Sequence, residues 1–400
     1  MPFTRDRLTW ANYLLLGYFA YLVNAFGPVI TFLRAELRLS YTVASLHTSA
    51  YALGAILSGL LAARAVRRWG RRAVCWTGAS GMALGCVLLT LATSPLLTIG
   101  SAAVMGLLGA FVVILVQATL ADQHGERRGT AFAESNVVAG VGAMLAPLLV
   151  GSAERSGLGW RSALWLVVLV LALLALCFGR EPFPQPARAG RTDGAARAPL
   201  PAAFWAYWIV MLLIVSTEFC LLLWGADFLA TVGGLTRSGA AAALSGFLLA
   251  VVVGRIVGSR LAGYIVDARL FRGALALTGA GFGLYWLAGW APLNVAGLVV
   301  AGLGSANLYP LALALAVGVV PEQADLASAR CALAAGIAIL LAPLLLAVLA
   351  DQVGIRHAYA VVIPLLVAAL LISQRAPRMG AGRVVPWPAP DRSDSDGGGG

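Results

Sequence analysis

Glu218 and Asp227 interrupt the apolar stretch MLLIVSTEFCLLLWGADFL, which runs from Met211 to Leu229. If this stretch belongs to a helix that starts near Phe204, Glu218 lies about 21 Å along it. An ionised carboxylate at the centre of a bilayer costs about 2.5–3.5 kcal/mol on insertion scales. Such a group is expected to face a wet cavity, to be paired, or to carry a proton. A carboxylate that gains and loses a proton can couple proton movement to other events.

Arg255 is the predicted neighbour of Glu218. Counted back from Asp267, it lies about 18 Å into the next apolar run, so the two charges are expected at nearly the same depth. Three interpretations of Glu218 stay open: a proton carrier, one half of a permanent ion pair, or a group that binds a cationic substrate directly. Arg255 could instead bind an anionic substrate. Asp227, nearer the outer mouth, is either a second proton-coupling carboxylate or a solvated acid at a helix end.

The composition indicates an all-α integral membrane protein. Of the 400 residues, 60% are hydrophobic and only 11% are charged, whereas soluble chains carry about 25% charged residues. The five cysteines form no CxxC motif and no cluster with histidine, so no metal site is predicted. No HExxH, GxSxG or P-loop motif is present, so neither an enzymatic activity nor a cofactor is expected.

Twelve stretches are long and apolar enough to cross a bilayer as helices. The first is expected to be retained, because it is longer than the apolar region of a signal peptide. The predicted spans are roughly 10–33, 41–62, 73–93, 96–119, 131–152, 160–179, 204–230, 239–265, 273–291, 294–318, 328–350 and 357–374.

The spans divide into two halves. We predict an N-terminal six-helix bundle (1–179), a Pro-, Gly- and Arg-rich linker (180–201), a C-terminal six-helix bundle (202–375) and a disordered tail (376–400). With the N-terminus inside, 20 of the 28 basic residues, all arginine, lie on the inner side and 6 in outer loops. This bias predicts cytoplasmic termini and linker. It also explains the net charge of +11 without a nucleic-acid partner.

Two loops carry related motifs. The loop after the second span reads ARAVRRWGRRAV (Ala63–Val74), and the one after the eighth reads GYIVDARLFRGAL (Gly263–Leu275). Both resemble the Gly-x-x-x-Asp-Arg-x-Gly-Arg-Arg signature of the major facilitator superfamily. The first copy departs from it, with Ala63 for the glycine and Arg67 for the aspartate. The resemblance implies gating roles for Arg68, Gly70, Arg71 and Asp267, and simple topology marking is the alternative.

The fifth and eleventh spans share a second motif. LAPLL at 145–149 recurs at 341–345, as expected for a fold built from two repeated halves. Around it, Gly140, Gly142, Pro147 and Gly151 resemble a worn copy of the superfamily's antiporter signature. Close helix packing through small residues is the alternative explanation.

The resemblance implies a twelve-helix secondary transporter of two six-helix pseudo-repeats that works by alternating access. In this family the first, fourth, seventh and tenth helices line a central cavity. Polar or aromatic residues on those helices are therefore candidate substrate contacts, with packing as the alternative: Tyr18, Asn24, Gln117, Trp224, Asn307 and Tyr309. Because the fifth helix faces the eighth in this family, Glu134 and Arg260 are expected to form a gating contact between the halves. The alternative is that the Arg260 side chain extends to the membrane interface.

The function expected from these residues is proton-coupled efflux of a small organic molecule across the bacterial inner membrane. One alternative is proton-coupled uptake of a small organic anion, with Arg255 as its anchor. The other is a receptor of the same fold that does not transport. The expected partners are the substrate, protons and the lipid bilayer, and the chain is expected to be a monomer.

Overall fold

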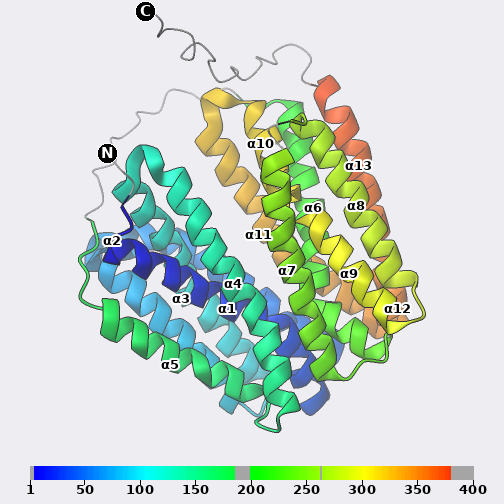
Figure 1. The fold of residues 1–400 in the computed structure, drawn as a ribbon, viewed down its shortest axis with the longest axis horizontal. Coiled ribbons are helices and arrows are strands. Elements are labelled where there is room, and N and C mark those ends of the chain that lie inside the picture. The colour runs from blue at the N-terminus through cyan, green and yellow to red at the C-terminus, as the bar shows by residue number, and fades with distance from the viewer. Residues whose placement is uncertain (1–3, 185–198, 262–263, 380–400) are drawn as a thin grey trace, which may run out of the picture.

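The computed structural model describes residues 4–184, 199–261 and 264–379, and these residues form helices and no strand. Figure 1 shows the helices as two groups that lie side by side. The first group holds α1 (Arg7–Glu36), α2 (Tyr41–Leu91), α3 (Pro95–His124), α4 (Arg128–Arg155) and α5 (Trp160–Phe178). The second holds α6 (Ala202–Thr231), α7 (Arg237–Leu261), α8 (Asp267–Leu287), α9 (Ala291–Ser305), α10 (Leu308–Gly318), α11 (Ala324–Val353), the short α12 (Ile355–Ala358) and α13 (Val362–Met379).

The first three helices start with ordinary polar caps. Ser40 and Ser94 accept hydrogen bonds from the first-turn N–H groups of α2 and α3, and Asp6 does the same for α1. Pro95 occupies the first turn of α3, where its missing N–H leaves no hydrogen bond unmade. Short polar connections therefore separate long apolar helices, as the sequence predicts.

The long helix α2 holds two of the predicted spans. Gly70 interrupts it with a backbone φ of 79°, which favours glycine. A straight helix would hold Tyr51 and Gly85 about 51 Å apart. Yet Tyr51 packs directly against Gly106 of α3, and a Cβ on Gly85 would lie 2.9 Å from the carbonyl oxygen of Ser101, also in α3. The chain therefore turns back at Gly70.

Ten helices of the described residues are long and apolar enough to span a membrane. The predicted all-α membrane class is thus confirmed. The expected number of twelve is not reached by this count, because α2 contains two predicted spans and α8, which overlaps the predicted span 273–291 as far as Leu287, is not one of the ten. The helix α13 continues to Met379, past the predicted bundle boundary at 375, and residues 380–400 lie outside the described residues.

The two groups of helices touch at one end of the molecule. We call it the closed end, where α1 and α6 finish, and call the opposite one the linker end, where α5 finishes and α6 begins. Gly27 of α1 packs directly on the carbonyl oxygen of Leu222 in α6. A Cβ on Gly151 of α4 would lie 2.5 Å from the carbonyl oxygen of Ser238 in α7. Figure 1 shows the two groups diverging from these contacts toward the linker end.

The start of the predicted linker is bound to the first group of helices. Arg7 donates to the Glu181 carboxylate at 2.6 Å and to the Cys177 carbonyl oxygen at 2.6 Å. Arg72 donates to the Gly179 carbonyl oxygen. Residues 185–198 of the linker lie outside the described residues.

Candidate functional site

A cavity of about 440 Å³ lies between the two groups of helices. Its size falls within the range of about 300–1,000 Å³ typical of small-molecule sites. Much of the lining is apolar and includes Phe19, Phe26, Tyr51 and Phe219. The polar lining residues are Asn24, Thr48, Asn136, Glu218 and Arg255. Among the described lining residues, Glu218 is the one acid and Arg255 the one base.

Glu218 lies near the middle of α6. It follows Ala202 by about 24 Å of helix and precedes Thr231 by about 20 Å. Its side chain is half-buried and faces the cavity. Within the described residues it has neither an ion-pair partner nor a hydrogen-bond partner. The structure therefore leaves this carboxylate free for a proton or a ligand.

Arg255 lies deeper toward the linker end than the sequence predicts. It is about 27 Å along α7 from Arg237, whereas Glu218 is about 20 Å from Thr231 at the closed end of α6. The two charges are thus offset by about 7 Å along the helix axes. Both side chains line the same cavity, but no ion pair within 4.0 Å joins them in this structure. The expected common depth is wrong, and the expected pair is not formed.

The other candidate substrate contacts divide into two sets. Asn24 lines the cavity, and its amide donates to the Ala20 carbonyl oxygen at 2.8 Å. Tyr309 is half-buried on α10 and is not among the residues that line the cavity. Tyr18 is 5% exposed and donates to the Ala79 carbonyl oxygen at 2.9 Å, inside its own bundle.

Trp224, Gln117 and Asn307 do not line the cavity either. The Trp224 indole is fully buried and donates to the Pro343 carbonyl oxygen at 3.1 Å. The Asn307 amide donates to the Gly254 carbonyl oxygen at 2.7 Å, which joins α10 to α7. Gln117 is exposed on α3 and is not among the residues that line the cavity. The prediction took polar and aromatic residues from the helices that line the cavity in the family, without knowing how each helix is rotated about its axis. It could therefore not separate cavity-facing residues from packing residues.

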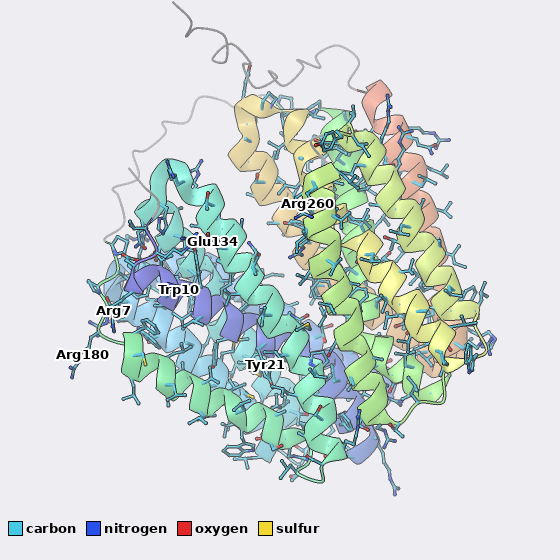
Figure 2. The ribbon with its side chains drawn as sticks, in the orientation of Figure 1. Arg7, Trp10, Tyr21, Glu134, Arg180 and Arg260 are labelled. Carbon is cyan, nitrogen blue, oxygen red and sulfur yellow. The ribbon has the colours of Figure 1, made fainter. Side chains whose placement is uncertain are left out.

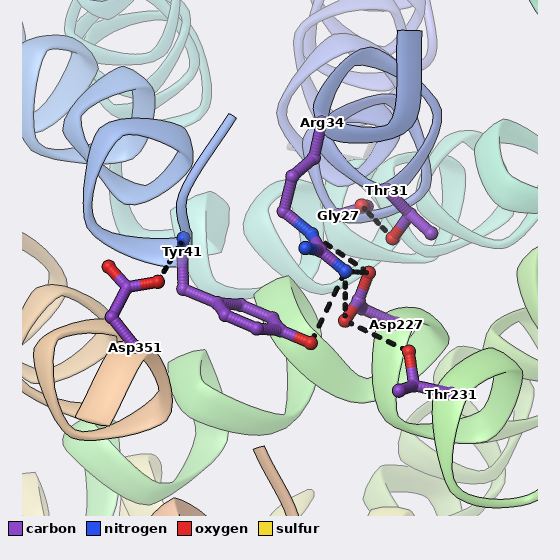
Figure 3. A network of polar contacts seen from close by, with 7 residues as sticks. All are labelled: Gly27, Thr31, Arg34, Tyr41, Asp227, Thr231 and Asp351. Atoms are coloured by element: carbon purple, nitrogen blue, oxygen red, sulfur yellow. Dashed lines mark hydrogen bonds and ion pairs between the residues drawn. The ribbon is translucent and has the colours of Figure 1, made fainter. Parts of the chain in front are cut away.

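Asp227 belongs to an ion pair that joins the two groups at the closed end (Figure 3). Its carboxylate accepts from the Arg34 guanidinium at 2.9 and 3.1 Å, and from the Thr231 hydroxyl at 3.4 Å. Arg34 also lies over the Tyr41 ring, 4.0 Å from its centroid. The position near a mouth of the bundle is as predicted. The carboxylate is only 2% exposed, so the interpretation as a solvated helix-end acid is wrong.

Asp351, at the end of α11, forms a second contact across the closed end (Figure 3). Its carboxylate accepts from the backbone N–H groups of Tyr41 and Thr42 at 2.7 and 2.9 Å. An acid at a helix N-terminus satisfies free N–H groups and interacts favourably with the helix dipole. Sequence reasoning missed Asp351 and the pairing of Arg34. One feature of the sequence could have indicated both contacts. Arg34 and Asp351 are each a charged residue near the end of an otherwise apolar helix.

The predicted gating residues of the first motif contact their own bundle. Arg71 donates to the Asp122 carboxylate at 2.6 Å, and the Arg68 guanidinium lies over the Trp69 ring, 5.6 Å from its centroid. Gly70 makes the turn within α2. In the second motif Asp267 is the first residue of α8, and Gly263 lies outside the described residues.

The expected contact between Glu134 and Arg260 is not formed. Glu134 accepts from Arg5 at 2.6 Å and from the Tyr13 hydroxyl at 3.1 Å, both in the first group of helices. Arg260 is exposed on α7, and no acid whose side chain is described lies within ion-pair distance. Figure 2 shows the two residues on opposite sides of the divergence between the groups. The separation at the linker end therefore keeps this pair apart.

Comparison with known proteins agrees with this architecture. The sequence model of the Major Facilitator Superfamily matches residues 11–290 and 226–391. An uncharacterised MFS-type transporter of Yersinia pestis is 24% identical over 301 residues, which cover 72% of this chain and 74% of the relative.

Several solved structures share the fold. A bacterial homologue of the human lysosomal transporter Spinster, inward-facing and occupied, has a TM-score of 0.80 at 16% identity and covers 94% of this chain and 98% of its own. A D-xylose–proton symporter has a TM-score of 0.72 at 15% identity, with 94% and 99% covered. The chain therefore belongs to the major facilitator superfamily, and is a multi-pass membrane protein of the secondary-transporter kind.

Proposed function

We propose that the protein is a proton-coupled exporter of small organic molecules, and that Glu218 is its proton carrier. The observation that supports this most is the state of Glu218: it is the one acid in the described cavity lining, lies at mid-helix, and has no partner among the described residues. The free-energy cost of a carboxylate at this depth in the membrane is lowest when the group can take up a proton.

The proposed topology puts the linker end in the cytoplasm, because arginine is concentrated in the loops of that end. The contacts at the closed end then shut the outer side. In this proposed topology the divergence of the two groups of helices faces the cytoplasm, which is the side from which an exporter loads its substrate.

The charges of the cavity favour a cationic substrate for export. With Glu218 ionised and Arg255 charged, the two lining charges cancel. A cation bound to ionised Glu218 gives the cavity a net charge of +1, and so does a proton without substrate. Exchange of the cationic substrate for a proton therefore leaves the net charge of the cavity unchanged. The protein then moves the same charge through its low-dielectric interior in both directions. The aromatic lining suits an apolar body on such a substrate.

Uptake of an organic anion is the second candidate, and Arg255 favours it. The guanidinium lies in the same cavity without an ion-pair partner within the described residues. If Glu218 is protonated, an anion on Arg255 makes the cavity neutral, as it is when both the proton and the anion have left. This arrangement favours movement of proton and anion in the same direction. The sign of the substrate's charge thus separates the two candidates.

The test uses cells stripped of their own exporters. Wild type and Glu218→Gln are compared at equal protein level against compounds of matched apolar body that are cationic, neutral or anionic. Export predicts resistance to cationic compounds, which a protonophore abolishes and Glu218→Gln loses. Accumulation of labelled anions by wild type would instead support uptake. Equal protection by both proteins would show that Glu218 is not the proton carrier.

A further inference from the structure

One face of the first part of α2 is apolar and exposed. Leu53, Leu57 and Leu60 are 52%, 45% and 71% exposed. At about 100° per residue these side chains lie within one narrow arc of the helix. The cavity-lining residues Thr48 and Tyr51 project from roughly the opposite side. The leucine face therefore points away from the cavity and toward the surrounding lipid.

Arg64 and Arg68 continue this same face toward the linker end. Leu60, Arg64 and Arg68 follow one another at a spacing of four residues, and both arginines are exposed. Measured from Tyr41 at the closed end, Arg64 lies about 35 Å and Arg68 about 41 Å along the helix. The hydrocarbon core is about 30 Å thick, and about 40–45 Å with its headgroups. Both guanidinium groups are thus expected at headgroup depth.

The protein supplies neither arginine with an acid among the residues that the structure describes. The acids at this end of the first group whose side chains are described have other partners: Asp122 binds Arg71, Glu134 binds Arg5, Glu181 binds Arg7, and Asp6 accepts from Thr9 and Gln123. Arg64 and Arg68 are separated by one helical turn, where like charges repel. An anion shared between them would remove this repulsion.

Trp69 and Gly70 complete the surface. The Trp69 ring is 62% exposed and lies under the Arg68 guanidinium. Tryptophan favours the membrane–water interface. The turn at Gly70 separates Arg64 and Arg68, which have no acidic partner among the described residues, from Arg71 and Arg72, which bind protein groups.

We infer that Arg64 and Arg68, with Trp69 beside them, bind the headgroup phosphate of an anionic phospholipid. Guanidinium groups bind phosphate oxygens in pairs, and the leucine face below gives the acyl chains an apolar surface. The partner is a membrane lipid and not free phosphate, because the arginines stand directly above that face. The inference needs only that α2 spans the membrane, and it is independent of the proposed substrate and coupling.

The test measures lipid binding to purified protein by native mass spectrometry. Phosphatidylglycerol is titrated against wild type, Arg64→Gln/Arg68→Gln, and the control Arg127→Gln/Arg128→Gln. The control removes two exposed arginines from another loop of the same end. We expect the first variant to bind about 30-fold more weakly, at about 1 kcal/mol per arginine and about 1.4 kcal/mol per tenfold. The control should bind like wild type.

Three outcomes would overturn the inference. Equal losses in the two double variants would show that only total charge matters. Equal binding of phosphatidylcholine with the same acyl chains would show that the anionic headgroup is not recognised. Displacement of the lipid by excess inorganic phosphate would assign the arginines to a soluble anion. If the double variant is poorly folded, Arg64→Gln alone replaces it, with Arg127→Gln as its control, and a weakening of about 5-fold is expected.

Discussion

Replacement of Asp227 by asparagine should open the closed end of the molecule. The Asp227 side chain is 3% exposed and that of Arg34 is 23% exposed, so the ion pair is largely buried. Removal of the carboxylate leaves the Arg34 charge buried without its counter-ion. In a state opened at this end, both groups are solvated and the substitution has little effect. The substitution therefore acts selectively against the closed state.

The expected size follows from the burial. Breaking a buried ion pair by removing one partner costs about 3–5 kcal/mol. Because Arg34 keeps some contact with solvent and the introduced amide can still accept a hydrogen bond, we take the lower end, about 3 kcal/mol. At about 1.4 kcal/mol per tenfold, the population open at this end should rise about 100-fold. In the double variant Arg34→Gln/Asp227→Asn no charge is left unpaired, so the population open at this end should fall most of the way back to that of wild type.

The assay is labelling of a cysteine in the cavity. Thr48 lines the cavity about 10 Å of helix from the closed end of α2. Thr48→Cys is labelled by a membrane-impermeant maleimide added on the closed-end side, with Cys177→Ser removing the one exposed native thiol of the described residues. Glu154→Gln is the control, because Glu154 lines the same closed-end depression but bonds within its own bundle.

Asp227→Asn should label about 100-fold faster than its parent, and Glu154→Gln should label at the parent rate. If Asp227→Asn labels within about twofold of its parent, the ion pair does not hold this end closed and the reasoning is refuted. Equal acceleration by Glu154→Gln would attribute the effect to the lost charge and not to the contact between bundles.

Three further predictions concern contacts elsewhere. Asp351→Ala removes an exposed helix cap worth about 1 kcal/mol, so the same assay should show about fivefold faster labelling, and an unchanged rate would contradict the role of this cap. Gly27→Ala puts a methyl group against the backbone of α6 and should accelerate labelling or lower the thermal unfolding midpoint, whereas Gly59→Ala, which has open space around it, should do neither. Arg71→Gln should lower the unfolding midpoint by removing the contact with Asp122, and Asp122→Asn should add little to it because the two share one interaction.

The local sequence sufficed for the membrane class, because a span is recognised from the summed hydropathy of about 20 neighbouring residues. The same local signal singled out Glu218, since a carboxylate in such a run is conspicuous without any knowledge of its neighbours. It also predicted a connection between the spans 41–62 and 73–93, because the arginine-rich segment between them interrupts the apolar pattern, but the exact place of the turn at Gly70 came from the structure.

Rotation of each helix was decided by packing. Tyr18 and Trp224 stand on helices expected to line the cavity, yet both face into packed interior. Each residue turns a helix by about 100°, so an error of two residues in a helix start points a side chain to the opposite side. Boundaries read from hydropathy carry an error of that size. The cavity-facing residues could therefore not be chosen from spacing alone.

The choice of partner for each charged residue also depended on tertiary structure. Arg34 and Asp227 lie in different halves of the chain, and each by itself is only a charge at a helix end. Glu134 had a plausible partner in Arg260, but the structure gives it to Arg5. Ion pairs form within a few ångströms, whereas the sequence reports only the order of residues along the chain. The sequence by itself determined which segments enter the membrane, and the packing of the two bundles decided which charges meet there.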